Sequence, residues 1–446
     1  MDKTDIPGTF NAGAMLAPIN ETNMARIWNK HKQTNTTLKR KVFIGMSGGV
    51  DSSVAAFLLK KDGYDVTGVF INGYNADGCE EKDAEDARKV AEHIGIPFYV
   101  LNAREEYFEN VVQYMIDEYK RGITPNPDVM CNKKIKFGIF LDKALKLGAD
   151  YIATGHYTCL HRNDEFRISN FEKHINSPTY RQNPKNDSKS NPTVGLPAQA
   201  GGQNPKFCLY EAKDRGKDQS YFLWTLTQEQ LKHCLFPIGG YTKPEVREIA
   251  RKTGLPTANK KDSQGICFLG KVKLPEFLKE YIEPRKGDVF DTEGNKVGEH
   301  DGVQFYTIGQ RHINLQLTTR DRQQTANNIK QKTDRKPFYI AEKDVKRNAL
   351  VIAEGSSNPA LFRSEIEITD VNFIDPLSFE ISVRARVRYR QPLAKAVLSK
   401  SKNRGRYRIV FDEPQKFIAP GQSAVFYSAH EDKNGLREML GGGVIT

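Results

Sequence analysis

The stretch GMSGGVDSS, from Gly45 to Ser53, decides how the rest of the chain is interpreted. The apolar segment KVFIGM leads into it and has the composition of a buried strand. After it, the spacing of Val54, Phe57 and Leu58 predicts one face of a helix. The two adjacent glycines let a ligand approach the backbone, and the serines and Asp51 lie beside the free NH groups of the helix start. Such a strand, glycine turn and helix start predict a cradle for an anion, and phosphate is the simplest candidate.

Two common phosphate-binding motifs are absent from this stretch. The ATPase P-loop needs GxxxxGK followed by Ser or Thr, and the dinucleotide fingerprint needs GxGxxG. SGGVDS instead resembles the signature of the PP-loop ATP pyrophosphatases, which split ATP into AMP and pyrophosphate while adenylating a carbonyl oxygen. The resemblance implies that ATP binds here and that Asp51 helps to hold Mg²⁺. The alternative is a serine-rich helix cap without a ligand, which six matching residues in order behind a strand disfavour.

Length and charge limit the class of protein. A chain of 446 residues is long enough for about two or three domains with cores of their own. No apolar run approaches the roughly 20 residues needed to cross a bilayer, so no membrane partner is expected. A formal charge of +12 favours a polyanionic partner, nucleic acid before a membrane surface.

The cysteines indicate a reducing compartment. They are scattered without CxxC pairs or histidine clusters at zinc-ligand spacing, which in a chain of this length argues against a disulfide scaffold. Their positions are Cys79, Cys131, Cys159, Cys208, Cys234 and Cys267. Since the N-terminus also lacks a secretory signal, a cytoplasmic protein is expected. Residues 1–39 are interpreted as a loosely ordered extension of unknown role.

Strands and helices alternate through residues 40–274, the predicted catalytic domain. Four apolar segments predict strands, at residues 41–46, 66–71, 98–103 and 151–155. Amphipathic segments between them predict helices, and this βαβ rhythm is typical of a doubly wound parallel sheet. Such sheets bind ligands at the carboxyl ends of their strands. GMSGGVDSS and TGHY both follow predicted strands, so we expect them to meet at that edge.

Composition divides the remaining chain into further parts. Residues 163–206 are rich in Asn, Pro, Ser, Gln and Gly without apolar periodicity, which predicts an exposed insertion in the α/β domain. After residue 274, short strands separated by Gly, Asn and Asp predict a β-rich central domain at 275–357 and a C-terminal β-barrel at 358–446. The polar, basic segment 314–335 interrupts these strands and is expected to be mobile.

The segment TPNPDVMCN carries the strongest chemical signal after the glycine loop. Its prolines restrict the backbone, Asp128 can cap the helix that begins there, and Cys131 lies in the first turn. A helix N-terminus with Lys133 and Lys134 close by favours the thiolate that a nucleophile requires. Asp128 is near enough to act as an acid or base. Taken alone, this motif would favour a buried cysteine behind an ordinary helix cap.

Other motifs decide between these alternatives. KDSQGICFLG places Cys267 in a polar loop that contains glycine, and GKDQSYFLW and TGHY add two more motifs. Together with SGGVDSS and NPDVMCN they resemble the tRNA 2-thiouridylases, the MnmA family, from about Lys41 to the end of the chain. The resemblance implies an ATP-dependent sulfurtransferase that adenylates the C2 carbonyl of wobble uridine 34 in tRNA. Persulfide sulfur then replaces the oxygen, which gives 2-thiouridine, AMP and pyrophosphate.

The resemblance implies a role for each matching residue. ATP would contact Gly45, Met46, Ser47, Gly48, Gly49, Val50, Asp51, Ser52, Ile71 and Gly155. The target base would contact Asn126, Pro127 and Asp128, the last also as proton donor or acceptor. The tRNA would contact His156, Lys217, Asp218, Gln219, Arg388, Tyr389 and Gln422. Cys267 would carry the persulfide, loaded by a sulfur-relay protein or a cysteine desulfurase, and Cys131 would release the sulfur through a transient disulfide.

Two expectations concern movement and charge. The loop that bears Cys267 has to deliver sulfur that is loaded outside the site, so we expect it to move. Arg384, Arg386, Arg388 and Arg390 alternate in sequence, so they are expected to share one exposed strand face and to contact tRNA phosphates. The alternative is an exposed cationic face without a function.

The chain departs from the family pattern in two places, and two rival functions stay open. Ile71 stands where methionine is common, and residues 312–317 read HINLQL where a glycine-rich KGLG stretch is usual. One rival is another PP-loop enzyme that acts on a small carbonyl substrate, which predicts pyrophosphate release without tRNA. The other is a tRNA-binding protein without catalysis, against which the intact pair Cys131 and Cys267 argues.

Overall fold

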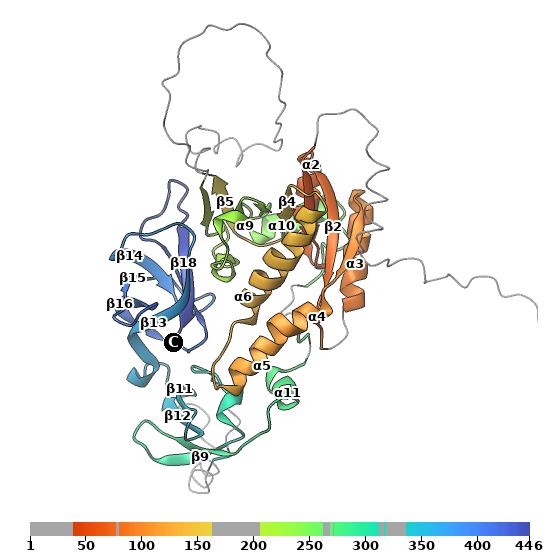
Figure 1. Cartoon of the computed structure of the whole chain (residues 1–446). Coiled ribbons are helices and arrows are strands. Elements are labelled where there is room, and N and C mark those ends of the chain that lie inside the picture. The colour runs from red at the N-terminus through yellow and green to blue at the C-terminus, as the bar shows by residue number, and fades with distance from the viewer. Residues whose placement is uncertain are drawn as a thin grey trace, which may run out of the picture.

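The computed structural model describes most of the chain, and three sheets organise the described part (Figure 1). The described residues are 39–76, 80–162, 206–261, 268–270, 272–311, 316–317 and 336–446. Cys79 and Cys267 lie outside them. So do nearly all of the predicted N-terminal extension, the predicted insertion and most of the segment expected to be mobile. The expected movement of the Cys267 loop therefore stays a prediction.

The first sheet is parallel, with the strand order β3-β2-β1-β4-β7. Its strands are β1 Lys41–Gly45, β2 Asp65–Asn72, β3 Phe98–Asn102, β4 Tyr151–Ala153 and β7 Cys234–Leu235. The doubly wound parallel sheet is confirmed, although the two-residue strand β7 was too short to predict. Because β2 and β4 flank β1, the loops that follow β1 and β4 are neighbours at the carboxyl edge.

Helices connect and cover these strands (Figure 1). The α-helices are α2 Val50–Lys61, α3 Glu80–Ile94, α4 Arg104–Tyr107, α5 Gln113–Lys120, α6 Pro127–Cys131, α7 Leu141–Lys146, α9 Gln228–Leu231, α10 Lys243–Lys252 and α11 Leu274–Lys279. Two wider π-helical segments continue α4 and α6, namely η2 Phe108–Val112 and η3 Asn132–Phe140. Short 3₁₀ turns are η5 Ser220–Phe222, η6 Val303–Phe305 and η7 Pro359–Leu361.

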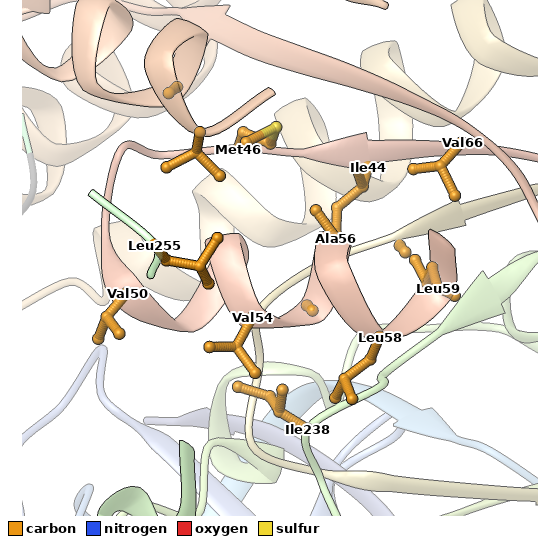
Figure 2. Packing of buried hydrophobic residues seen from close by; sticks show 14 of the residues in the cluster. Ile44, Met46, Val50, Val54, Ala56, Leu58, Leu59, Val66, Ile238 and Leu255 are labelled. Carbon is orange, nitrogen blue, oxygen red and sulfur yellow. The ribbon is translucent and has the colours of Figure 1, made fainter. Parts of the chain in front are cut away.

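The core beneath the glycine loop consists of α2 packed against the parallel sheet (Figure 2). Val54 and Leu58, on the predicted helical face, are buried, and Ile238 belongs to the same cluster. Ile44 of β1 is also fully buried there. Burial of apolar side chains on both sides of the loop holds the strand end and the helix start in a fixed relation.

The two other sheets confirm the predicted β-rich remainder. The central sheet has the order β10-β9-β8-β12-β11. Its strands are β8 Gly287–Phe290, β9 Lys296–His300, β10 Gln316–Leu317, β11 Phe338–Asp344 and β12 Ala349–Glu354. The C-terminal strands are β13 Phe362–Phe373, β14 Ile381–Arg386, β15 Ala394–Lys400, β16 Tyr407–Lys416, β17 Ser423–Ser428 and β18 Glu438–Ile445. Pairing of β13 with β18 closes them into a barrel.

The barrel is joined to the α/β unit by a strand pair. The antiparallel strands β5 Cys159–Arg162 and β6 Phe207–Tyr210 extend the barrel sheet, since β6 pairs with β18. Buried side chains add to this contact: the Trp224 indole donates to Ser423 Oγ at 3.0 Å, and the Tyr221 hydroxyl donates to the Ser423 carbonyl at 2.9 Å. In sequence, the predicted insertion lies between these two strands.

The prediction that four arginines share one exposed strand face is wrong. Strand β14 ends at Arg386, and Arg390 follows with a positive φ of 65°, so the alternation stops. Arg386 is only 7% exposed, because residues of the α/β unit cover this part of the barrel. Its guanidinium donates to Glu211 at 2.9 Å and lies 3.4 Å from an Asp218 oxygen. Arg386 therefore holds the two units together.

We predict that Gly421→Ala loosens the barrel from the α/β unit. Gly421 has a φ of +87°, and a Cβ there would lie 2.2 Å from Ile123 Cγ2 and 2.8 Å from the Thr124 carbonyl oxygen. The expected loss of stability is about 2–4 kcal/mol, measured as a lower thermal midpoint. Gly405→Ala is the matched control, since its φ is +78° with nothing within 4 Å, and should cost only about 1 kcal/mol. Equal effects of the two substitutions would contradict the proposed close contact.

Candidate active site

A cavity of about 360 Å³ lies where the loops after β1 and β4 meet. This volume is in the range of small-molecule sites. Ten of the residues with a predicted role in binding ATP, the target base or tRNA, or in the reaction, line this cavity. They are Gly45, Met46, Ser47, Asp51, Ser52, Ile71, Cys131, Gly155, His156 and Gln219. Two motifs about 80 positions apart in sequence, the glycine loop and the segment with Cys131, therefore share one cavity.

The glycine loop is shaped by close contacts that only glycine permits. Gly48 has a φ of +68°, and a Cβ there would lie 2.3 Å from the Asp83 carbonyl oxygen. Gly49 is the N-cap residue of α2 without a side-chain cap, so the first NH groups of the helix have no partner within it. Ser52 Oγ accepts from Ser47 N and donates to the Gly49 carbonyl, both at 3.2 Å. These hydroxyl contacts fix the loop while its NH groups stay available to an anion.

Gly155 brings the two loops into direct contact. A Cβ at this position would lie 2.7 Å from Ser52 N, so no larger residue fits without displacing the first turn of α2. The predicted ATP contact of Gly155 is compatible with this place, because it borders the same cavity as Ser47 and Ser52. Val50, in contrast, is buried in the core beneath the loop.

The N-terminus of α2 carries an ion pair that was not predicted from the sequence. Lys243 Nζ, at the start of α10, lies 2.8 Å from both carboxylate oxygens of Asp51. The Tyr157 hydroxyl donates to the same carboxylate at 2.7 Å. The Lys243 side chain is only 10% exposed. Sequence could have indicated it, since the Thr242–Glu245 capping box places Lys243 at the first helical position.

The NPD segment begins helix α6, with a cap that differs from the predicted one. The Asn126 side chain accepts from Val129 N at 3.3 Å and Pro127 occupies the first turn, so the prediction that Asp128 caps the helix is wrong. The Asp128 carboxylate is therefore not used as the helix cap. Burial raises its pKa above the ordinary value of 3.8, and the nearby Lys136 opposes that rise. A carboxylate with a raised pKa accepts a proton more readily than an ordinary aspartate does.

Cys131 is 4% exposed and borders the cavity at the end of α6. Lys133 and Lys134, expected beside the thiol, are instead exposed, and neither lines the cavity. Lys136 lines it in their place, together with Ile135. Lys136 could not be predicted from the sequence, because an α-helical spacing does not place it on the same side as Cys131.

The residues predicted to contact tRNA lie at two places. His156 and Gln219 line the cavity; burial lowers the pKa of His156 well below 6.5, and its Nδ1 lies 2.8 Å from Thr154 Oγ1. Lys217 is partly exposed nearby. The others lie at the barrel junction.

Of those at the junction, Asp218 is 2% exposed and faces Arg386. The Arg388 guanidinium donates to the Ile308 carbonyl, and Tyr389 packs on Phe222 with ring centroids 4.4 Å apart. Gln422 Nε2 donates to the carbonyls of Thr124 and Pro125, at 3.1 and 2.8 Å. Their contacts with tRNA stay predictions.

Within the described chain, no group of three or more His, Cys, Asp or Glu side chains is arranged to hold a metal ion by itself. Mg²⁺ needs only one or two carboxylates when phosphate oxygens complete its shell. A carboxylate has about four lone-pair sites, and the contacts of Asp51 with Lys243 and Tyr157 use three of them. The remaining site on Oδ2 fits a single bond to Mg²⁺.

Among the described residues, no helix has the length and apolar composition that a membrane span requires.

Removing the ammonium at the head of α2 should weaken ATP binding. We expect Lys243→Met to raise the ATP Kd about tenfold or more, because Asp51 would then face the triphosphate as an unpaired anion. Equilibrium dialysis with labelled ATP measures this. Lys252→Met, on the exposed end of the same helix, is the control and should leave the Kd within about twofold. An unchanged Kd for Lys243→Met would show that the pair does not organise the nucleotide site.

Comparisons with known proteins agree with this arrangement. Three family models match the chain: the tRNA methyl transferase HUP domain at residues 40–188 and 191–271, the tRNA methyl transferase PRC-barrel domain at 275–354, and the aminomethyltransferase beta-barrel domain at 363–445.

Curated relatives match nearly the whole length. "tRNA-specific 2-thiouridylase MnmA 1" of Geobacillus kaustophilus is 41% identical, over 87% of this chain and 92% of that protein. The proteins named "tRNA-specific 2-thiouridylase MnmA" of Streptococcus equi subsp. zooepidemicus and Coxiella burnetii are 39% and 38% identical, over 91% and 95% of this chain and 95% and 100% of theirs. With this identity over most of both chains, the protein belongs to the MnmA family of tRNA-specific 2-thiouridylases.

Proposed function

We propose that this protein is an ATP-dependent tRNA 2-thiouridylase that converts the wobble uridine 34 to its 2-thio form. The observation that carries the proposal is the shared cavity, which joins a PP-loop to Cys131 at the carboxyl edge of the sheet. Relatives named as tRNA-specific 2-thiouridylases match most of the chain, which supports the same conclusion. The persulfide donor would be a sulfur-relay protein or a cysteine desulfurase.

ATP would bind with its phosphates against the first NH groups of α2 and its base beside Ile71. The free NH groups, the glycine loop and Ser47 offer donors to the phosphates. Asp51 would hold Mg²⁺ through its remaining lone pair, and the ion would supply charge neutralisation to the phosphates. Lys243 fixes the orientation of that carboxylate.

The first chemical step activates the base. The C2 carbonyl oxygen of uridine attacks the α-phosphorus of ATP, and the bond from that phosphorus to the bridging oxygen breaks with its electron pair leaving on pyrophosphate. The N3 proton of uridine is lost as the adenylate forms. Asp128, whose pKa is raised by burial and whose carboxylate is not used as a helix cap, would accept that proton.

The second step transfers sulfur. The terminal sulfur of a persulfide on Cys267 attacks C2, and AMP leaves with the former carbonyl oxygen. The Cys131 thiolate then attacks the Cys267 sulfur, so that the S–S electron pair stays on the sulfur bonded to C2. N3 of the base then takes back a proton, which the protonated Asp128 would return, so the products are 2-thiouridine and a disulfide between Cys131 and Cys267. An external thiol has to reduce this disulfide before the next turnover. Cys267 lies outside the described residues, and its role rests on sequence.

The tRNA has to present its base to a cavity inside the protein. Uridine 34 would leave the anticodon stack, as base-modifying enzymes require. The net charge of +12 favours association with the phosphate backbone. A second hollow at the barrel junction, lined among others by Arg215, Arg384 and Arg390, adds positive charge to the surface. The rival PP-loop function would need a small carbonyl substrate in place of the base.

Thiolation of unmodified tRNA by the purified protein tests the proposal. With ATP, Mg²⁺ and a persulfide source, tRNAs with uridine at position 34 should gain sulfur and migrate more slowly in a mercury-containing gel. Cys131→Ser and Cys267→Ser should abolish the shift. Cys159→Ser and Cys234→Ser are the controls and should retain it, since burial raises the pKa of both thiols and neither borders the cavity. ATP cleavage to AMP with a small acceptor, and no thiolated tRNA, would favour the rival function.

Asp128→Asn should separate activity from stability. A raised carboxyl pKa in the folded state means that stability is greatest below the unfolded pKa and is lost as pH rises through the folded pKa. Removal of the charge should therefore leave the thermal midpoint at pH 7.5 unchanged or higher. Thiolation should fall about 10²-fold or more, because the proton acceptor is gone.

The wild-type rate should also fall as pH drops through a value above 3.8, the ordinary aspartate pKa, and the variant's residual rate should not share this dependence. Rates from pH 5 to 8 and melting curves measure both properties. A variant that keeps the wild-type rate would remove Asp128 from the mechanism.

A further inference from the structure

One charged group in the cavity is not used by the mechanism above. Lys136 is the single lysine or arginine among the described residues that line the cavity. The lysines that reach the surrounding carboxylates are engaged: Lys243 binds Asp51, and Lys260 lies 2.8 Å from Asp83. For the partly buried Lys136 side chain, the described part of the chain contains no ion pair or hydrogen bond. An ammonium in such a place is available to an anionic ligand.

The helix winding brings Lys136 to the same cavity as the reactive thiol. In an α-helix, residues five positions apart are turned by about 140° around the axis, so Cys131 and Lys136 would diverge. The segment from Asn132 to Phe140 is instead a π-helix, in which residues five apart are linked by the backbone hydrogen bonds and lie closer to one side. Cys131, Ile135, Lys136 and Phe140 all line the cavity as a result. Such segments are uncommon and occur often at functional sites.

The charge of Lys136 acts on both sides of the site. It opposes the rise in the pKa of Asp128, at the predicted position of the target base. It also contributes to the lowered pKa of His156, which belongs to the loop facing the first turn of α2. Lys136 thus lies within electrostatic reach of the base side and of the nucleotide side. If the target base lies at Asp128 and the phosphates of ATP lie at the glycine loop, the group that reacts between them is the α-phosphate.

We propose, on the basis of the thiouridylase function above, that Lys136 is a catalytic residue whose ammonium binds the α-phosphate of ATP during adenylation of uridine. In that step a bond forms from the carbonyl oxygen to the α-phosphorus, while the bond to the pyrophosphate oxygen breaks. Negative charge on the equatorial oxygens is then stabilised by the Lys136 ammonium. Lys243 cannot take this part, because Asp51 holds its ammonium at 2.8 Å.

The test is the single-turnover rate of pyrophosphate release, measured with excess enzyme, unmodified tRNA and ATP in the absence of persulfide. This assay reports adenylation alone. Lys136→Met should slow the release about 10²–10³-fold, as for the loss of one donor to a developing anion. Lys136→Arg, which keeps the charge, should recover at least a tenth of the wild-type rate. Lys133→Met and Lys134→Met, exposed residues of the same helix, are matched controls and should stay within about twofold of wild type.

Three results separate the possible failures. If the wild type releases no pyrophosphate with tRNA, the thiouridylase function fails, and the role of Lys136 fails with it. If wild type is active and Lys136→Met keeps its single-turnover rate, or slows only the later sulfur step, the proposal for Lys136 is overturned and the function stands. If Lys136→Met and Lys136→Arg are equally slow while both keep the wild-type thermal midpoint and tRNA affinity, position 136 needs lysine for its shape, and the charge proposal is likewise overturned.

Discussion

The close approach of Gly155 to the first turn of α2 is the constraint on which the site depends. A Cβ at Gly155 would lie 2.7 Å from Ser52 N, so the loops after β1 and β4 touch through backbone. The parallel pairing of β1 with β4 sets up that approach, and the buried core of Val54, Leu58 and Ile44 keeps it in place. Loss of the contact would open the NH cradle and separate it from Cys131 and Lys136, which complete the cavity from the helix opposite.

The barrel contributes to the same site at a distance. Gln422 donates to the carbonyls of Thr124 and Pro125, immediately before the NPD segment, and Pro420 accepts from Thr124 N at 3.1 Å. The barrel therefore supports the loop that is proposed to receive the base. At the other end of the junction, Arg386 spans from β14 to two carboxylates of the α/β unit. A domain that would bind tRNA is thus also part of the framework around the catalytic cavity.

Sequence predicted the features that depend on local pattern and could not predict those that depend on packing. The continuous apolar segments of β1 to β4 and the helical spacing of α2 were predicted, because these patterns are local. The strand β7 was not predicted, because it is only two residues long.

Among the site residues, motif matching identified the glycine loop and Cys131. Lys243 and Lys136 were missed because they reach the site through tertiary contact and π-helical winding. The four arginines were misjudged because the covering α/β residues come from far along the chain.

The central claim is that the C2 oxygen of uridine leaves on AMP. The most direct measurement uses tRNA with ¹⁸O at C2 of uridine 34, one round of thiolation, and mass spectrometry of the nucleotide products. The mechanism predicts one ¹⁸O in the phosphate of AMP for each 2-thiouridine formed, and none in pyrophosphate. If 2-thiouridine forms and the label appears in pyrophosphate or in water, activation by adenylation is contradicted. The proposed role of the glycine loop in binding ATP would be contradicted with it.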